Sequence, residues 1–215
     1  MGTYYRRKLP HIHPPEAVFF VTFRLAGSLP VHVVQQLRAQ LRAEERHLRL
    51  RTPGDSYPRK RYELQKRFFG RYDDQLDNLQ YGPAWLRRPE IATIVQPELH
   101  RLNGTQYDLI AYCIMPNHVH LLVNMARFRS TGNAPATSPL SRALRILKGR
   151  TARLANQALN RTGKFWQDES YDHVVRDWVE LERILRYIVY NPVKARLVED
   201  WQEWPYTFVT EDLTL

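Results

Sequence analysis

The stretch of residues 107–123, YDLIAYCIMPNHVHLLV, limits the fold of this chain more than any other. It is strongly apolar, and it contains two histidines, His118 and His120, with one residue between them. A proline and an asparagine just before them mark a turn, so we expect one strand over 107–115 and the next over 118–124. Side chains two residues apart in a strand lie on one face, about 6.6 Å apart along it, so the two histidines could bind one cation.

A lone His-x-His pair has simpler interpretations. One or both histidines could be ordinary core or surface residues, so a functional interpretation needs partners elsewhere in the chain. A metal hydrolase with an H-x-H-x-D-H motif would need further His or Asp ligands close by, and residues 121–124 supply none. An amidohydrolase barrel needs about 250 residues, and the chain has 215.

The other periodic segments predict a mixed fold. Residues 17–25, AVFFVTFRL, are aromatic and β-branched and indicate a central strand. Apolar residues at helical spacing predict helices over 31–51, 89–102, 140–159 and 177–190, with a weaker helical pattern over 57–70, a loop over 73–88 and an extended piece over 165–175. We expect Pro97 to kink or interrupt one helix and Asn191-Pro192 to end the last. Without βαβα alternation, these elements indicate an α+β domain with an antiparallel sheet.

Length and composition predict one domain over 1–215. Within it we expect a charged insertion at about 57–88, a flexible loop at 126–139, and an aromatic tail at 199–215 that packs as a flap. No apolar run reaches the length of a membrane span, the first 16 residues contain no apolar segment of signal-peptide length, and Cys113 is the sole cysteine. We therefore expect a cytoplasmic protein with no membrane partner.

Positive charge is concentrated in one part of the sequence. Between Asp108 and Asp168 there is no acidic residue and there are nine Lys or Arg residues, so nearly all of the net charge of +10 lies in this window. A solvated helix face normally mixes both signs, so we expect a nucleic acid as its target, with a membrane surface the weaker alternative. The predicted nucleic-acid-binding side chains are Arg142, Arg145, Lys148, Arg150 and Arg153 in the basic helix, together with His173 and Arg176.

The last predicted helix offers a nucleophile and a further ligand. Tyr187 and Asn191 are four residues apart and so share one helix face. The Asn191 amide oxygen could complete a two-histidine site for Mg²⁺ or Mn²⁺, and Tyr187 beside it could attack a phosphate. The alternative is that Tyr187 is an ordinary amphipathic-helix residue and Asn191 a helix stop. Tyr190 is a weaker alternative nucleophile.

Five segments carry a resemblance to a known family. MPNHVHLLV, LKGRTARLAN, FWQDESYDHVVRD, LERILRYIVYNPVKARLV and DWQEWPYTF occur in this order. Together they resemble the REP-associated tyrosine transposases, a branch of the HUH single-tyrosine transposases, over roughly residues 15–208. The chain departs from compact members of that family by its charged insertion.

The resemblance implies a ferredoxin-like α+β fold with helices packed on an antiparallel sheet. It implies Mg²⁺ or Mn²⁺ held by His118, His120 and, less securely, Asn191, and cleavage and joining of single-stranded or hairpin DNA through a covalent 5′-phosphotyrosine on Tyr187. The DNA targets of the family are hairpins of repeated palindromic elements, and the protein would act as a monomer or a homodimer. The alternative is a catalytically silent relative that binds DNA or RNA hairpins.

The acid-free window predicts that DNA binding depends steeply on salt. The logarithm of the affinity should fall with the logarithm of salt concentration by about 0.7 per neutralised phosphate on a single strand. Replacing Arg145, Lys148 and Arg153 together with Ala should flatten that slope by roughly two to three units. Binding titrations at several salt concentrations measure the slope, and an unchanged value would move the binding surface elsewhere.

Overall fold

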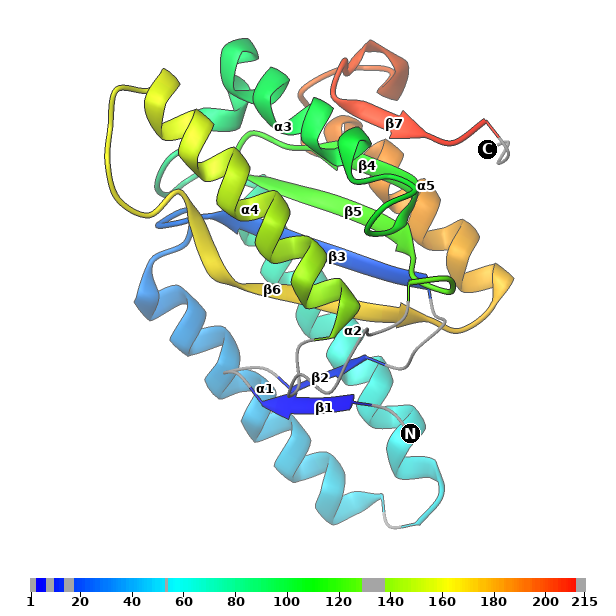
Figure 1. Cartoon of the computed structure of the whole chain (residues 1–215). Coiled ribbons are helices and arrows are strands. Elements are labelled where there is room, and N and C mark those ends of the chain that lie inside the picture. Colours follow the sequence, from blue (N-terminus) through cyan, green and yellow to red (C-terminus); the bar gives the residue numbers. More distant parts are fainter. Residues whose placement is uncertain (1–2, 7–9, 14–17, 53, 129–137, 212–215) are drawn as a thin grey trace. The chain divides into compact units, whose positions relative to one another are not determined.

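The computed structural model describes residues 3–6, 10–13, 18–52, 54–128 and 138–211 (Figure 1). The chain divides into two compact units: a sheet unit of Met1–Ala26 with Ala84–Leu215, and a helical unit of Gly27–Pro83. The predicted insertion at 57–88 corresponds to the later part of the helical unit, which also takes in the helix predicted over 31–51. Single-domain organisation stays a prediction, and most of the loop predicted at 126–139 lies outside the described residues.

The sheet unit is built on five antiparallel strands. They are β3 (Val18–Leu25), β4 (Asp108–Ile114), β5 (His118–Asn124), β6 (Trp166–Val175) and β7 (Thr207–Val209), in the spatial order β6-β3-β5-β4-β7. The strands β3 and β5 lie side by side in the middle, flanked by β6 and β4, which is the ferredoxin-like order. The predicted α+β fold with a ferredoxin-like antiparallel sheet is confirmed. Two short strands, β1 (Thr3–Arg6) and β2 (Pro10–His13), pair separately.

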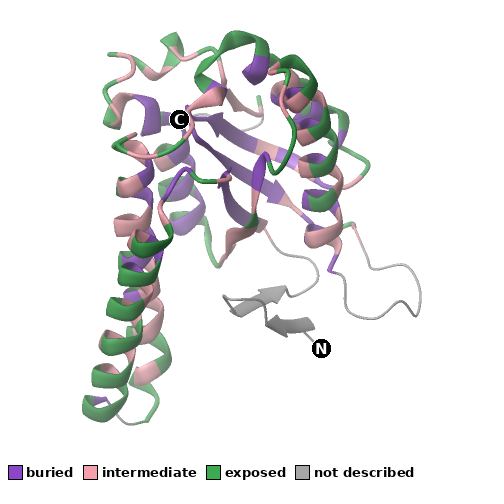
Figure 2. Cartoon of the chain, turned by 90° about the vertical axis from the view of Figure 1, so that its left-hand side faces the viewer, coloured by how far each residue is buried: buried purple, intermediate pink, exposed green. Residues whose placement is uncertain are grey.

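Alternation along the central strands creates the main core. Phe19, Val21 and Phe23 of β3 are buried with Val119, Leu121 and Val123 of β5 in one apolar cluster. This face of the sheet is covered by α3 (Pro89–Arg101) and α4 (Pro139–Ala158), whose apolar stripes belong to the same cluster. A third helix, α5 (Trp178–Lys194), packs against the sheet from the opposite face (Figure 1). Figure 2 shows the buried residues gathered in the strands.

Local chemistry explains where α4 begins. Pro139 occupies the first helical turn, where a missing N–H is tolerated. The Ser138 hydroxyl accepts a hydrogen bond from the Ser141 backbone N–H at 3.1 Å, a standard N-cap. Two short 3-10 turns complete the unit, η1 (Trp85–Arg87) and η2 (Trp201–Glu203). No described helix is both long enough and apolar enough to cross a membrane.

The helical unit consists of α1 (Val31–Arg51) and α2 (Ser56–Asp77), which pack on each other. A small apolar cluster of Leu29, Val34 and Leu76 lies at one end of the pair. Along their length, charged side chains of the two helices meet, as in the Arg71–Glu44 pair at 2.8 Å. The positive and negative side chains of this segment therefore form ion pairs between α1 and α2.

Two element predictions were wrong, and the interruption considered at Pro97 does not occur. The segment predicted as a loop over 73–88 begins with the last turn of α2, because Leu76 continues the apolar stripe of that helix into the cluster. Pro97 does not interrupt α3, whose neighbouring residues Val95 and Leu99 are fully buried in the core. Pro192 does not end α5, because the backbone hydrogen bonds resume with Ala195 N–H donating to Asn191 O.

The C-terminal prediction needs refinement. The aromatic tail was expected to pack as a flap, and part of it instead extends the sheet as β7, paired with the edge strand β4. Tyr112 of β4 stacks on Phe208 of β7, with ring centroids 5.5 Å apart. The aromatic character of the tail therefore serves cross-strand pairing.

The backbone at the two ends of the helical unit, at Gly27 and Gly82, comes into close contact, and this contact leads to a prediction about stability. Gly82 has φ +66°, and a Cβ there would lie 2.0 Å from the Gly27 carbonyl oxygen, whereas a Cβ at Gly70 in α2 would meet open space. Gly82→Ala should therefore lower the free energy of unfolding by at least ~2 kcal/mol. The matched control Gly70→Ala should raise it by about 0.5–1 kcal/mol. Urea unfolding followed by circular dichroism measures both, and equal effects would contradict the close approach.

Candidate active site

The strand register sets the direction of both histidines. In the pairing of β3 with β5, Thr22 lies opposite His120 and Arg24 opposite His118. Because Val119 and Leu121 point into the core beneath α3 and α4, the histidines between and beside them point to the face that carries α5. Both imidazoles are fully buried.

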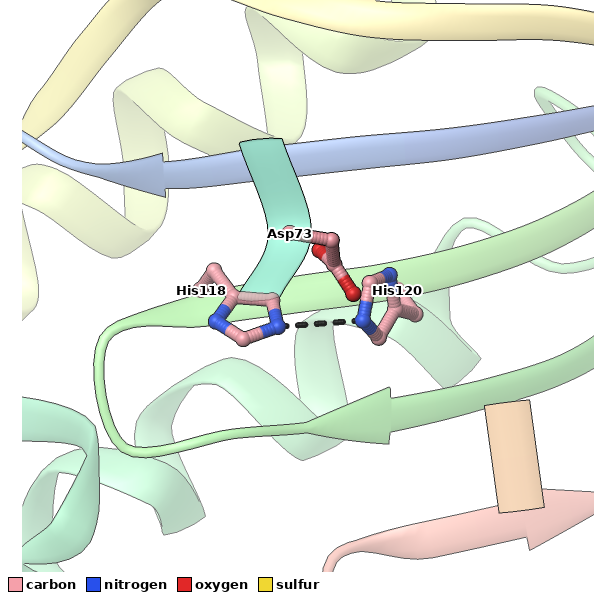
Figure 3. Close-up of side chains that lie close together, drawn as sticks. All are labelled: Asp73, His118 and His120. Atoms are coloured by element: carbon pink, nitrogen blue, oxygen red, sulfur yellow. Dashed lines mark hydrogen bonds between the residues drawn. The ribbon is translucent and has the colours of Figure 1, made fainter. Parts of the chain in front are cut away.

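The two imidazoles approach each other through the same ring atom. His118 Nε2 and His120 Nε2 are 3.0 Å apart (Figure 3). The remaining nitrogens are hydrogen-bonded: His118 Nδ1 lies 2.7 Å from Asn117 Oδ1, and His120 Nδ1 lies 2.8 Å from Thr22 Oγ1. Each ring is therefore oriented by one neighbour and directs its other nitrogen to a shared point. Asp73, also drawn in Figure 3, belongs to the helical unit.

This arrangement fits a divalent cation. Two nitrogens that each lie ~2.1 Å from a metal ion at a right angle are ~3.0 Å apart, and the two Nε2 atoms have this separation. Hydrogen-bonded Nδ1 atoms are the usual support of histidine ligands. The two histidines could therefore hold a metal ion, and the identity of the ion stays a prediction.

Asn191 offers a further donor. It is 1% exposed, and neither its amide oxygen nor its amide nitrogen has a hydrogen-bond partner among the described residues. A buried amide without a hydrogen bond typically lowers the free energy of unfolding by about 1–3 kcal/mol, so we expect this side chain to have a partner. A bound cation would supply one to the amide oxygen. Its role as third ligand stays a prediction.

Tyr187 lies next to the histidine pair. Its ring centroid is 5.4 Å from that of His120 and 6.1 Å from that of Phe20. Lys194 Nζ is 5.6 Å from the centre of the Tyr187 ring. Tyr187, Asn191 and Lys194 follow one another at intervals of four and three residues, and so share one face of α5.

The alternative tyrosines have different surroundings. Tyr190 is 49% exposed and lies three residues beyond Tyr187 on α5. Tyr171 is on β6, and burial raises the pKa of its hydroxyl, which keeps it a neutral phenol. Among these three, Tyr187 is the one whose ring contacts His120 in the described structure.

A buried carboxylate fixes the start of α5. Glu180 accepts a hydrogen bond from the Arg176 backbone N–H at 3.0 Å and pairs with Arg183 at 3.0 Å and with His173 of β6 at 3.2 Å. Asp177 caps the helix by accepting from the Glu180 N–H at 2.8 Å. The helix that carries Tyr187 is thereby attached to the end of β6. His173 takes part in this attachment, and its contact with DNA stays a prediction.

The basic side chains of α4 are separated from the histidines by the sheet, because α4 covers the other face. Lys148 donates to the backbone oxygens of Gln167 and Asp168 at 2.6 and 3.1 Å, and Arg150 pairs with Glu98 at 2.5 Å. Of the five residues of α4 that were predicted to bind nucleic acid, Arg142 is half-buried, and Lys148 and Arg150 are held by the hydrogen bonds and the ion pair just described. Arg145 and Arg153 are exposed and form no ion pair with any described residue. In the triple Ala variant, Arg145 and Arg153 should produce most of the change in salt slope.

Sequence reasoning missed three residues of this site. Thr22 carried no signal, because its partner is almost a hundred residues away. Asn117 was interpreted only as a turn residue, although its side chain also holds His118. The position of Lys194, two helical turns after Tyr187, could have indicated it.

Comparison with known proteins finds similarity over part of the chain. Residues 99–191 match the family model for IS200-like transposases, and the match includes both histidines, Tyr187 and Asn191. A curated Haemophilus influenzae protein named as a REP-associated tyrosine transposase is 30% identical over 108 residues, which cover 50% of this chain and 61% of that protein. The chain thus matches about three fifths of this relative's length.

A solved structure, a REP-associated tyrosine transposase bound to a REP hairpin, aligns over 94% of this chain and 80% of that chain, with 16% identity and a TM-score of 0.44. The resemblance predicted from the sequence is confirmed by the transposase family match and by the curated relative.

The geometry of the histidines predicts metal binding without DNA. The wild-type chain should bind one Mn²⁺, and His118→Ala and His120→Ala should each weaken that binding at least tenfold, because one of two converging nitrogens is lost. His100→Ala is the matched control, since His100 contacts Tyr112 and Phe208 instead. Electron paramagnetic resonance of free Mn²⁺ measures the affinity. Equal affinity in all four proteins would give the histidine pair a structural role.

Proposed function

We propose that this protein cleaves and joins single-stranded or hairpin DNA through a covalent 5′-phosphotyrosine on Tyr187, with Mg²⁺ or Mn²⁺ held by His118 and His120. The observation that carries the proposal is the contact of the Tyr187 ring with His120, whose Nε2 lies 3.0 Å from that of His118. The half-buried ring that we propose as the nucleophile thus lies beside the two buried histidines that we propose as metal ligands. The match of residues 99–191 to the family model for IS200-like transposases supports DNA as the substrate.

The residues would divide the chemistry as follows. His118 and His120, supported by Asn191, would hold the cation. Such an ion supplies positive charge that polarises a phosphate oxygen and lowers the barrier by several kcal/mol. Tyr187 Oη attacks the phosphorus, the Oη–P bond forms as the P–O3′ bond breaks, the phenol proton passes to solvent, and the leaving 3′ oxygen takes up a proton. The positive charge of Lys194 favours the negative charge that develops on the phenol oxygen.

A tyrosine nucleophile suits an enzyme that must rejoin strands. The phosphotyrosine keeps the energy of the broken phosphodiester, so a 3′-hydroxyl can attack it and reverse the step. An activated water would instead hydrolyse the strand irreversibly. Cutting and joining are then one reaction in two directions.

Because the basic helix and the histidines lie on opposite faces of the sheet, they would contact different parts of the DNA. Arg145 and Arg153 are exposed on α4, on the sheet face opposite His118 and His120. A single strand at Tyr187 and a stem near α4 would be two regions of one hairpin substrate. The curated relative is named for REP elements, which supports repeated palindromes as the target. Monomeric or dimeric state and a cytoplasmic location stay predictions.

A catalytically silent hairpin-binding protein is the alternative function. It would need the basic surface of α4 but neither Tyr187 nor the metal ligands. The unsatisfied amide of buried Asn191 and the converging Nε2 atoms favour the enzyme, because neither arrangement serves binding alone.

The decisive variant is Tyr187→Phe, which removes one oxygen and little packing. It should bind labelled hairpin DNA and Mn²⁺ as the wild type does, yet form no covalent adduct and release no 3′-hydroxyl product, because the attacking atom is gone. The matched control Tyr190→Phe, on the same helix, should keep both products. Denaturing gels with labelled hairpins, followed by peptide mapping, measure the adduct. An adduct on Tyr190 or Tyr171 would change the nucleophile, and binding without any adduct in the wild type would favour the silent alternative.

A further inference from the structure

Charge is distributed unevenly along the helical unit. Residues 46–61, where α1 ends and α2 begins, contain six Lys or Arg residues and one acidic residue, Asp55, which gives a net charge of +5. The rest of the unit, residues 27–45 and 62–83, contains five Lys or Arg residues and six acidic residues, a net charge of −1. We call residues 46–61 the basic tip of the helical unit.

Most cations of the basic tip have no acidic partner. Those that are exposed and form no ion pair with any residue that the structure describes are Arg46, Arg49, Arg51 and Lys60. Of the other two, Arg59 lies 3.6 Å from Glu63, and Arg61 pairs with Glu45 across the two helices at 3.2 Å. Figure 2 shows much of this end of the helix pair as exposed.

The stability of the helices does not explain this arrangement. Arg59 and Lys60 lie at the N-terminal end of α2, where the helix dipole disfavours positive charge, and the first turn of α2 contains no acidic residue. Arg46 and Arg49 are three residues apart on α1, where like charges repel. A solvated helix surface normally mixes both signs. The concentration of positive charge therefore indicates a polyanionic partner.

The side chains of the basic tip suit phosphates better than bases or lipids. Tyr57 is its one aromatic residue and is half-buried, which leaves little of the ring for base stacking. Leu50, 83% exposed, is its one exposed large hydrophobic residue, whereas binding to a lipid surface uses a whole apolar helix face. Lys and Arg side chains held on two helices can contact several phosphates of a nucleic acid without reading its sequence.

We propose that the basic tip is a second DNA-binding site, which binds the phosphate backbone of duplex DNA independently of sequence. A duplex carries one negative charge per ~1.7 Å of its axis, twice the density of one of its strands, and so offers most to cations that are fixed in place. Arg46, Arg49 and Lys60 supply contacts of this kind. The inference rests on the proposed function for its choice of DNA, and the stem of a hairpin substrate is such a duplex.

The linear sequence conceals this site. Outside the acid-free window between Asp108 and Asp168, positive and negative charges nearly cancel, so the rest of the chain has a net charge of +1. The packing of α1 on α2 brings the cations of 46–51 and 59–61 to one end of the helix pair. The net charge of the chain therefore understates the local charge.

The test replaces Arg46, Arg49 and Lys60 together with Gln in the full chain. Binding to a DNA duplex of about 20 base pairs is measured at several salt concentrations, with a chelator present so that no strand is cut. Loss of three phosphate contacts should flatten the plot of log affinity against log salt by about 0.9 per contact, or roughly 2.7 units. Between about 50 and 200 mM salt, the affinity of the wild type should then fall roughly 40-fold more than that of the variant.

The matched control removes the same three charges from the sheet unit by replacing Arg88, Arg127 and Arg186 with Gln. These side chains are also exposed, but each has an acidic partner, namely Glu90, Asp108 and Glu182. The control should keep the wild-type slope. An unchanged slope in the tip variant, or equal flattening in both variants, would overturn the proposal.

Two further outcomes bear on the partner. Duplexes of unrelated sequence should lose the same affinity in the tip variant, and a loss confined to one sequence would contradict a backbone contact. If phosphatidylserine vesicles bind the wild type but not the tip variant, while duplex binding is the same in both, the tip is a membrane site and the proposal fails.

A measurement on the wild-type chain covers the case of a misfolded variant, which circular dichroism would reveal. Bound duplex should protect Lys60 from acetylation by acetic anhydride, as measured by mass spectrometry, and high salt should remove the protection. Equal acetylation of Lys60 with and without duplex would overturn the proposal.

Failure of this inference differs from failure of the proposed function. A chain that needs the basic tip for duplex binding but forms no adduct on Tyr187 would overturn the proposed chemistry and leave the tip site in place. An adduct on Tyr187 together with an unchanged slope in the tip variant would do the reverse.

Discussion

The antiparallel pairing of β3 with β5 is the interaction on which the site depends. Its register places Thr22 opposite His120 and sends Val119 and Leu121 to the other face, into the core. A slip of one residue would exchange the two faces, burying imidazoles among apolar side chains and exposing the core residues. The same hydrophobic pattern that stabilises the sheet therefore also orients the histidines. Packing and chemistry are fixed by one set of backbone hydrogen bonds.

The second requirement is the position of α5, which brings Tyr187 to the histidines. A buried carboxylate costs several kcal/mol unless it is paired, and Glu180 is paired with Arg183 and with His173 of β6. Its contact with the Arg176 N–H joins the end of β6 to the first turn of the helix. The start of α5 is thereby set by a charged contact at one end of the site, and Tyr187 follows two turns later.

The two faces of the sheet unit differ in their electrostatic character. The sheet has the histidines and Tyr187 on one face and α4, with its exposed Arg145 and Arg153, over the other. Surface cations attract a phosphate backbone over about one Debye length of ~10 Å, and they impose little geometry on it. The face with His118 and His120 imposes more, since both imidazoles are buried and hydrogen-bonded. This division agrees with a substrate that has both a duplex and a single-stranded part.

What the sequence by itself determined is local. Apolar spacing predicted α1 with its observed bounds, and apolar, aromatic and β-branched runs predicted β3, β4 and β5. The intervals between His118 and His120 and between Tyr187 and Asn191 predicted shared faces. These follow from the periods of strand and helix, which involve only near neighbours. The tertiary structure alone decided that Thr22 meets His120, that Lys148 is held by β6, and that Pro97 and Pro192 remain within helices. Each of these depends on contacts between segments far apart in the chain, where packing energy outweighs local preference.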